Sequence, residues 1–191
     1  MPGDGTVWRE LDLHRFLSGF ADPRFERMIR HWLALRQADA IPHRGAVDPM
    51  KFHDLLDMVW LMERHPDSHY RYRLAGQAIA EIHGGIRRGT DTSSLFSPQA
   101  IDMFRPRWEA VLDRGQLVRA EGVVRLSEGD QVSRVERLML PLRGDDGSVS
   151  VILGATSYER PRGVPGLTTT DFPPTNIQHC PLQDIPLGSC R

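Results

Sequence analysis

The chain has 191 residues, of which 40% are hydrophobic and 26% charged, and its formal net charge is −1. This composition is typical of a globular protein, and the length allows one sizeable core with additions at its ends. A net charge close to zero gives neither the strongly basic field that recruits nucleic acid nor an acidic tail that attracts basic partners.

The sequence contains no segment typical of export or of a membrane span. Residues 1–6 lack the basic region and the apolar run of a signal peptide, and no later stretch reaches the roughly 18 uncharged apolar residues that a span needs. Both cysteines, Cys180 and Cys190, lie among the last dozen residues, so no disulfide framework is expected to hold the core. We therefore expect a cytoplasmic protein.

The first 39 residues predict a helical segment. Apolar residues in the stretch 11–20 recur at the spacing of one helix face, and a second helix begins at Asp22-Pro23 and is expected to end near Asp39. Its apolar stripe includes Phe25, Ile29 and Trp32. Two interpretations of this stripe stay open: packing of the helix onto the domain, or the interface of a homodimer.

The connector 41–49 leads into a short helical turn that ends near Leu56, and a buried strand follows. In residues 70–76 aromatic and apolar residues alternate with arginines, which predicts a strand that delivers the chain into a short helix at 77–85. After further short helical turns, Pro98 opens a longer helix with Pro106 in its middle. Three antiparallel strands then follow. The expected strands are residues 58–63, 70–76, 117–126, 132–142 and 149–157.

The composition changes after Arg160, because six prolines occur in the last 31 residues. We place a domain boundary there and expect residues 161–191 to form a flexible tail without a periodic element. An alternative is that its apolar residues dock on a groove or on a partner. These are Leu167, Phe172, Ile177 and Leu182.

Four short motifs occur in a fixed order along residues 28–158. They are Trp32-Leu33-Ala34-Leu35-Arg36, Pro42-His43-Arg44-Gly45-Ala46-Val47-Asp48-Pro49, Tyr72-Arg73-Leu74-Ala75-Gly76 and Leu153-Gly154-Ala155. The chain resembles a bacterial family of small single-PAS proteins, which typically read W-x-x-L-R, P-x-R-x-x-I-D-P, Y-R-L-x-G and I-L-G-A. The resemblance implies an α+β PAS fold over residues 40–160, with a five-stranded antiparallel sheet, helices on one face and N-terminal helices before it.

The resemblance also implies a non-enzymatic sensory or regulatory role in bacterial signal transduction, in which the chain binds a small molecule or a protein partner. A homodimer is the expected assembly. Two alternatives stay open: an interaction adaptor whose core holds no ligand, and a small α+β enzyme. The family implies no particular ligand.

A PAS sheet and its helices normally enclose a small apolar pocket with a few directed polar groups. The ligand-binding candidates are therefore aromatic residues on elements that should face one another, together with polar residues next to the central strand. Arginine would bind an acidic group and the aromatic rings would stack on the ligand. The alternative is that the aromatic residues form core and that the arginine lies in a solvated turn. The candidates are Trp60, Tyr72, His83, Arg87 and Trp108.

Neither haem nor flavin is favoured as the cofactor, which stays unknown. The helix 98–114, where a haem-binding PAS domain often places its histidine, has none, although His53 and His83 stay as possible ligands. A photoreactive flavin needs a cysteine beside its ring, and both cysteines lie near the end of the chain. Noncovalent flavin stays open.

No sequence motif indicates catalysis, and we name no catalytic and no metal-binding residue. The nucleophile elbow, the zinc-protease helix and the phosphate-binding glycine loop are all missing from the sequence. Scattered arginines without interleaved aromatic residues do not form a pattern for single-stranded nucleic acid.

Overall fold

The computed structural model describes residues 7–36, 41–67, 69–125, 132–159 and 174–185. Its strands are β1 (Val7–Glu10), β2 (Val59–Arg64), β3 (Tyr70–Ala75), β4 (Leu117–Arg125), β5 (Val132–Arg143), β6 (Val149–Tyr158) and β7 (Pro174–Cys180). They form one sheet in the order β1-β7-β4-β5-β6-β2-β3. Neighbouring strands are antiparallel except β1 and β7, which are parallel.

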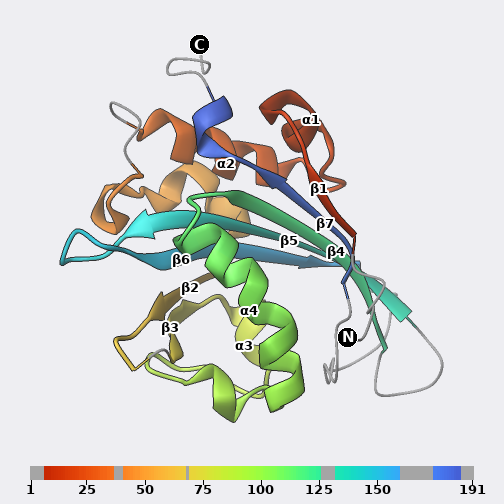
Figure 1. The fold of residues 1–191 in the computed structure, drawn as a ribbon. Coiled ribbons are helices and arrows are strands. Elements are labelled where there is room, and N and C mark those ends of the chain that lie inside the picture. The colour runs from red at the N-terminus through yellow and green to blue at the C-terminus, as the bar shows by residue number, and fades with distance from the viewer. Residues whose placement is uncertain (1–6, 37–40, 68, 126–131, 160–173, 186–191) are drawn as a thin grey trace.

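Helices cover both faces of the sheet. The α-helices are α1 (Leu13–Ser18), α2 (Arg24–Ala34), α3 (Gln77–Ile82) and α4 (Pro98–Leu112), and the short 3-10 helices are η1 (Arg44–Ala46), η2 (Pro49–Leu55), η3 (Thr92–Ser94) and η4 (Leu182–Asp184). Figure 1 shows α1 and α2 on one face of the sheet and α3 and α4 on the other. We call these the α2 face and the α4 face.

The predicted α+β class is confirmed, but three details of the predicted sheet are wrong. The described strands number seven rather than five, one pair is parallel, and helices lie on both faces rather than on one. The extra strands are β1 and β7, which lie at the end of the sheet beyond β4. They come from the two terminal segments, which the sequence assigned to helices and to a tail.

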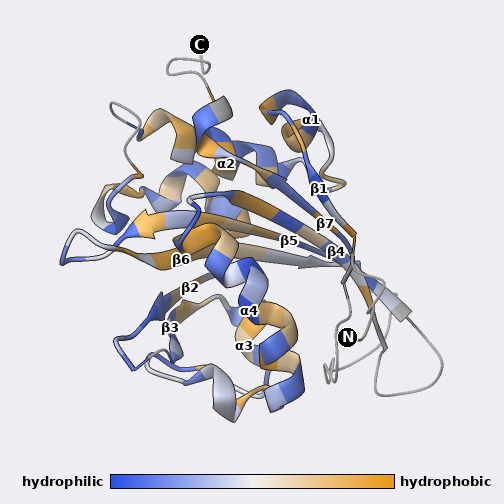
Figure 2. Ribbon diagram, viewed as in Figure 1, coloured by the Kyte–Doolittle hydropathy of each residue, from blue (hydrophilic) through white to orange (hydrophobic). Residues whose placement is uncertain are grey.

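The period-2 pattern of the strands divides the core into two layers. In β5, Leu138 and Leu140 belong to the layer under α2, whereas Val135 and Met139 belong to the layer under α4. In Figure 2, hydrophobic colours recur along the strands of the sheet. Because both faces are covered, the central strands contribute apolar side chains to each layer.

Capping side chains fix where several helices begin. Ser97 precedes α4, and its hydroxyl accepts a hydrogen bond from the backbone N of Ala100 at 3.2 Å, while Pro98 occupies the first helical position. Asp48 similarly accepts a bond from the N of Met50 at 3.0 Å at the start of η2. These are the Ser-Pro and Asp-Pro signals on which the sequence prediction rested.

The apolar stripe of α2 is fully buried against the sheet. Phe25, Ile29 and Trp32 each have 0% exposure, and the indole N of Trp32 donates a hydrogen bond to the carbonyl of Pro141 at 2.8 Å. These side chains therefore lie where the first interpretation of the stripe, packing of the helix onto the domain, expects them. A homodimer built on them would require α2 to leave the sheet. The helix ends at Ala34, earlier than expected, and residues 37–40 lie outside the described part of the chain.

The expectation of a tail without regular structure is wrong for β7. This strand pairs with β1 on one side and with β4 on the other, and it buries Ile177 and Cys180. Its sequence carries little local signal, because its buried residues Ile177 and Cys180 are three positions apart and do not follow the period-2 alternation of a strand. Long-range pairing with β4 decides its structure. The other tail residues that were expected to dock, Leu167 and Phe172, lie outside the described residues.

Within the described ranges, no helix is both long enough and apolar enough to cross a membrane.

Candidate functional site

Strand β5 places an arginine in the layer under α4. Arg137 lies between Val135 and Met139, which both belong to the α4-face core, so the alternation of the strand turns Arg137 toward the same layer. It is only partly exposed. An arginine at this position of a core strand is unusual, because a buried charge requires polar or aromatic neighbours to hold it.

Arg137 meets a hydroxyl and two aromatic rings. Its Nε donates a hydrogen bond to Thr156 Oγ1 at 3.1 Å, and the indole N of Trp60 donates to the same oxygen at 3.0 Å. The guanidinium carbon lies 5.9 Å from the centroid of the Trp60 ring and 6.0 Å from that of Phe104. Both distances lie at the outer edge of the range of cation–π attraction.

The charge of Arg137 also reaches three titratable side chains. Burial raises the pKa of Tyr72 to about 12, and the nearby Arg137 opposes this rise. Burial lowers the pKa of His83 to about 4, and Arg137 lowers it further. Burial likewise raises the pKa of Tyr158, against the effect of Arg137. We define the Arg137 site as this arginine with its neighbours Trp60, Tyr72, His83, Phe104, Thr156 and Tyr158.

An aromatic shell extends from the site toward α4. The Trp60 and Tyr72 rings meet edge to face at 6.2 Å, and Phe104 contacts Phe96 at 5.2 Å and Trp108 at 5.9 Å. A second buried guanidinium, that of Arg107, lies 5.2 Å from the Phe104 ring. The layer under α4 thus combines aromatic surface with two positive charges.

A glycine on the next strand allows Trp60 to lie flat against the sheet. Trp60 pairs with Gly154 of β6, and a Cβ at Gly154 would approach the indole carbons to about 2.1 Å. No side chain fits there unless the buried indole moves. The glycine of the I-L-G-A motif therefore positions the aromatic floor of the Arg137 site.

The structure brings together some of the predicted ligand-binding residues. Trp60, Tyr72 and His83 belong to the Arg137 site. Trp108 lies one ring away through Phe104, and its ring contacts that of Tyr70 at 4.5 Å with an interplanar angle of 47°. Arg87 is different, because it is exposed and its backbone N donates to Thr90 Oγ1 in a turn. Arg87 therefore lies in a solvated turn, which is the alternative that the sequence left open for it.

Arg137 is not among the candidates that the sequence pattern predicts. A signal was available: in Val135-Glu136-Arg137-Leu138-Met139, the arginine shares the parity of two core residues, Val135 and Met139. For a sheet with one covered face, period-2 alternation predicts that charged residues of a strand point outward to solvent. Here helices cover both faces of the sheet, so neither the odd-numbered nor the even-numbered side chains of β5 face solvent.

A hollow of about 420 Å³ lies beside α3, next to the Arg137 site. Asp57 and Met58 line one wall, and Gln77, Ala78 and Glu81 of α3 line the other, with Tyr158 as the shared boundary to the site. The close packing of Gly76 on the carbonyls of Leu56 and Asp57 holds the start of α3 there.

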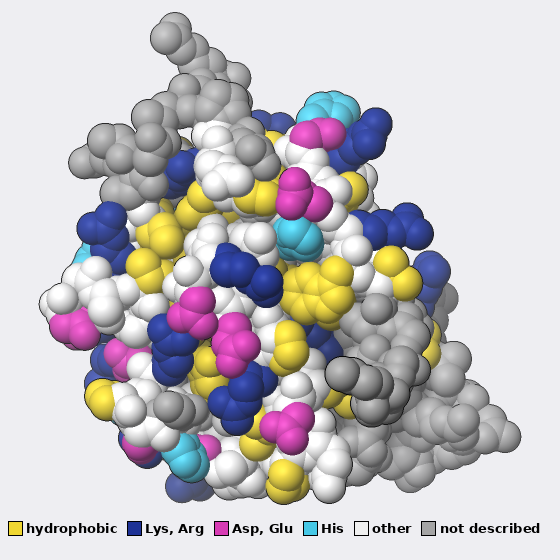
Figure 3. Space-filling view, in the orientation of Figure 1, with side chains coloured by type: hydrophobic (Ala, Val, Ile, Leu, Met, Phe, Trp, Pro, Cys, Tyr) yellow, Lys and Arg dark blue, Asp and Glu magenta, His cyan; other side chains and the backbone are white. Residues whose placement is uncertain are grey.

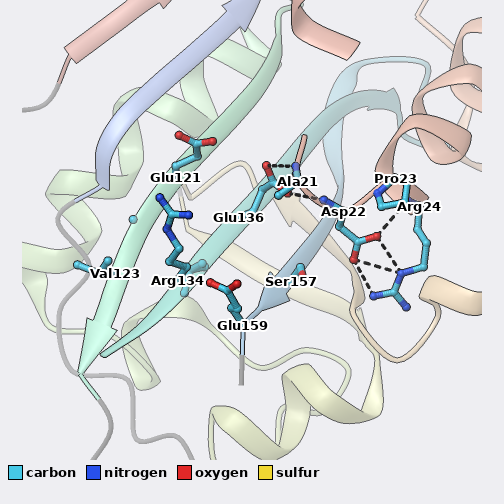
Figure 4. Close-up of a pocket in the computed structure, with 12 residues that line it drawn as sticks. Ala21, Asp22, Pro23, Arg24, Glu121, Val123, Arg134, Glu136, Ser157 and Glu159 are labelled. Atoms are coloured by element: carbon cyan, nitrogen blue, oxygen red, sulfur yellow. Dashed lines mark hydrogen bonds and ion pairs between the residues drawn. The ribbon is translucent and has the colours of Figure 1, made fainter. Parts of the chain in front are cut away.

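A second hollow, of about 580 Å³, lies on the α2 face beside the turn between α1 and α2 (Figure 4). Glu136 of β5 anchors this turn, because its carboxylate accepts hydrogen bonds from the backbone N of Ala21 and of Asp22 at 3.1 to 3.2 Å. Arg119 donates to the same carboxylate at 2.7 and 3.0 Å. The walls carry charges of both signs, including Asp22 paired with Arg24 and the exposed Arg134.

The surface charge is mixed. In Figure 3, basic and acidic side chains are interspersed over the visible face, and no field of a single sign covers it.

The described residues offer little for the cofactors weighed from the sequence. His53 is exposed, and α4 contains no histidine. Cys180 lies in the core layer under α2, on the other side of the sheet from the Arg137 site, so it supplies no thiol for photoreactive flavin chemistry there. Among the described residues no group of three or more potential ligands could hold a metal ion.

Comparisons with known proteins identify the fold family. Residues 21–157 match the model of a family described as PAS domain. No curated protein matches the chain.

Three solved structures show weak similarity. The LOV protein of Rhodobacter sphaeroides is 15% identical, with a TM-score of 0.40 over 61% of this chain and 71% of that one. A light-oxygen-voltage domain studied with a flavin analogue is 15% identical, with a TM-score of 0.35 over 57% and 82%. The LOV domain of the blue-light photoreceptor Aureochrome1 is 12% identical, with a TM-score of 0.32 over 56% and 84%.

Proposed function

The chain belongs to the PAS domain family, and from this membership and the Arg137 site we propose that it is a non-enzymatic sensory or regulatory protein that binds a small carboxylic acid. The aromatic rings of Trp60, Tyr72 and Phe104 would contact the apolar body of the ligand, and the guanidinium of Arg137 would bind its carboxylate.

The single observation that carries this proposal is the placement of Arg137. A positive charge in an aromatic layer acts strongly on its neighbours, because the local dielectric is low. Burial lowers the pKa of His83 and Arg137 lowers it further, whereas Arg137 opposes the burial that raises the pKa values of Tyr72 and Tyr158. Sites for small molecules typically have this composition: mostly apolar walls with a few directed polar groups.

Strand β5 offers a direct route for a signal. Arg137 faces the ligand layer, and the preceding residue, Glu136, faces the opposite layer and holds the α1–α2 turn. A ligand that binds one arrangement of β5 better than another shifts the population of the two, and the turn shifts with it. In this proposal the hollow of Figure 4 is the surface on which a partner reads the signal.

A thermal-shift screen of small aromatic and aliphatic carboxylates tests the proposal. We expect some acids to stabilise the wild-type protein, by roughly 5 to 10 °C at a hundredfold excess over Kd, because a ligand that binds only the folded state adds about 2.7 kcal/mol. The corresponding amides should have little effect. The variant Arg137→Gln should lose the response, whereas Arg137→Lys should retain part of it.

Arg87→Gln is the matched control, because it removes an exposed arginine outside the site. A response that survives equally in Arg137→Gln would contradict the proposal. If no acid stabilises the wild-type protein, the ligand-free interaction adaptor becomes the better account, with the hollow on the α2 face as its contact surface.

A further inference from the structure

Two histidines hold the connector between α2 and η2. His31, in the last turn of α2, accepts a hydrogen bond at its Nε2 from the backbone N of Asp48 at 3.0 Å, directly before η2 begins. His43, within the connector, accepts a bond at its Nδ1 from the backbone N of Gly45 at 3.1 Å. A ring nitrogen accepts a hydrogen bond only when it carries no proton, so both contacts require a neutral imidazole.

A carboxylate lies close to each histidine. Asp145 Oδ1, in the turn between β5 and β6, is 3.7 Å from Nε2 of His43. Burial lowers the pKa of His31, the charge of Asp48 opposes this effect, and the charge of Lys51 adds to it. Protonation would therefore change each ring from the acceptor of a backbone N–H into a cation beside a carboxylate.

The other contact that holds the connector does not change in the range in which histidines titrate. Arg44 donates from its Nε to Asp145 Oδ1 at 2.9 Å, and this hydrogen bond together with the charges of Arg44 and Arg73 lowers the pKa of Asp145. The guanidinium stays charged and the carboxylate stays ionised, so this ion pair is present at neutral and at mildly acidic pH. The hydrogen bonds to His31 and His43 are the ones that proton uptake removes.

We propose that residues 43–48 form a pH-sensitive clasp between α2 and η2, which is closed while His31 and His43 are neutral and opens when they are protonated. In the open state each backbone N–H loses its acceptor and each imidazolium pairs with the neighbouring carboxylate. The carboxylate of Asp48 also caps η2, because it accepts a hydrogen bond from the backbone N of Met50 at 3.0 Å. A bond to protonated His31 draws it away from this cap. The clasp does not depend on the proposed ligand.

NMR spectroscopy of the ¹⁵N-labelled protein between about pH 7.5 and about pH 5 tests the clasp. This interval ends above the pKa of about 4 of His83, so that histidine stays mostly neutral. At the upper pH we expect the ring proton of His31 on Nδ1 and that of His43 on Nε2. As the pH falls, the amide resonances of Asp48 and Gly45 should shift with the titration of His31 and His43, and the protection of both amides from exchange should fall by about fivefold.

Two substitutions separate the hydrogen bonds from the titration. In His31→Gln and His43→Asn the side-chain amide oxygen takes the place of the accepting nitrogen, and the amide takes up no proton in this range. The double variant should therefore keep the clasp closed, with the amide resonances of Gly45 and Asp48 unchanged over the interval. His14→Gln is the matched control, because His14 is an exposed histidine of α1 outside the connector, and it should behave like the wild-type protein.

Three results would overturn the clasp. The Gly45 and Asp48 amides of the wild-type protein could fail to follow the two histidines, the same shifts could occur in the double variant, or either ring could carry its proton on the accepting nitrogen at the upper pH. If the double variant does not fold, the single variants decide. His31→Gln should then hold the Asp48 amide constant and leave that of Gly45 pH-dependent, and His43→Asn should do the converse.

Discussion

At the residue scale, burial sets the direction of the pKa shifts beside Arg137, and the charge of this arginine modifies them. His83 and Tyr158 would titrate near their ordinary pKa values in solvent, and burial beside Arg137 moves the pKa of His83 down and leaves that of Tyr158 raised. A bound carboxylate would offset the charge of Arg137, so ligand binding should raise the pKa of His83.

The lowered pKa of His83 makes stability depend on pH. The unfolded chain takes up a proton on this histidine near pH 6.5, whereas the folded chain does so only at about pH 4. Its contribution to the free energy of unfolding is therefore lost as the pH falls from about 6.5 to about 4, by at most roughly 3 kcal/mol.

Urea unfolding of the wild-type protein and of His83→Gln at pH 7 and at pH 4.5 measures this contribution. The wild-type protein should lose about 2 to 3 kcal/mol more than the variant over that interval. Parallel losses in the two proteins would show that His83 is not held neutral by its surroundings.

The sequence identified the aromatic half of the site but not its charge. Trp60 and Tyr72 follow from alternation in strands that local pattern already predicts. Arg137 does not, because its inward orientation depends on α2 covering the other face of the sheet. The coverage of that face by α2 is a tertiary contact, and no local stretch of the sequence predicts it.

At the scale of elements, the helices and central strands follow from local signals, and the two added strands do not. Caps, prolines and turn glycines mark α4, η2 and the hairpins. In contrast, β1 has only four residues, all exposed, and β7 alternates weakly. Both strands exist because they pair with each other and β7 pairs with β4, a long-range interaction.

Strand β7 should therefore stabilise the fold. Ile177→Ala removes a side chain that is 1% exposed, and we expect a loss of about 2 to 4 kcal/mol in the free energy of unfolding. Gln183→Ala, at an exposed position of η4, is the control and should change stability by less than about 0.5 kcal/mol. An unchanged unfolding midpoint for Ile177→Ala would mean that β7 does not belong to the folded core.

A substitution in α2 distinguishes packing of this helix onto the domain from a homodimer interface. Ile29 is fully buried, so Ile29→Glu should unfold the protein or cost more than about 4 kcal/mol, because it buries an unpaired charge. Light scattering and circular dichroism of this variant check the result. A folded monomer obtained from a wild-type dimer would show instead that α2 is the dimer interface.

At the scale of the whole molecule, the sheet separates the layer that contains the Arg137 site from a layer that holds the α1–α2 turn. Adjacent residues of β5, Arg137 and Glu136, contact one layer each. The family fold was predictable from the order of elements and motifs. The placement of Arg137 and Glu136 in opposite covered layers was not, because it depends on which side of the sheet each terminal segment packs.

The most direct measurement is native mass spectrometry of the freshly purified wild-type protein and of Arg137→Gln, compared with their denatured masses. The account predicts that the wild-type protein retains the mass of a small acid and that Arg137→Gln has the mass of the chain alone. A wild-type protein with no added mass, or an added mass that both proteins retain equally, would contradict it.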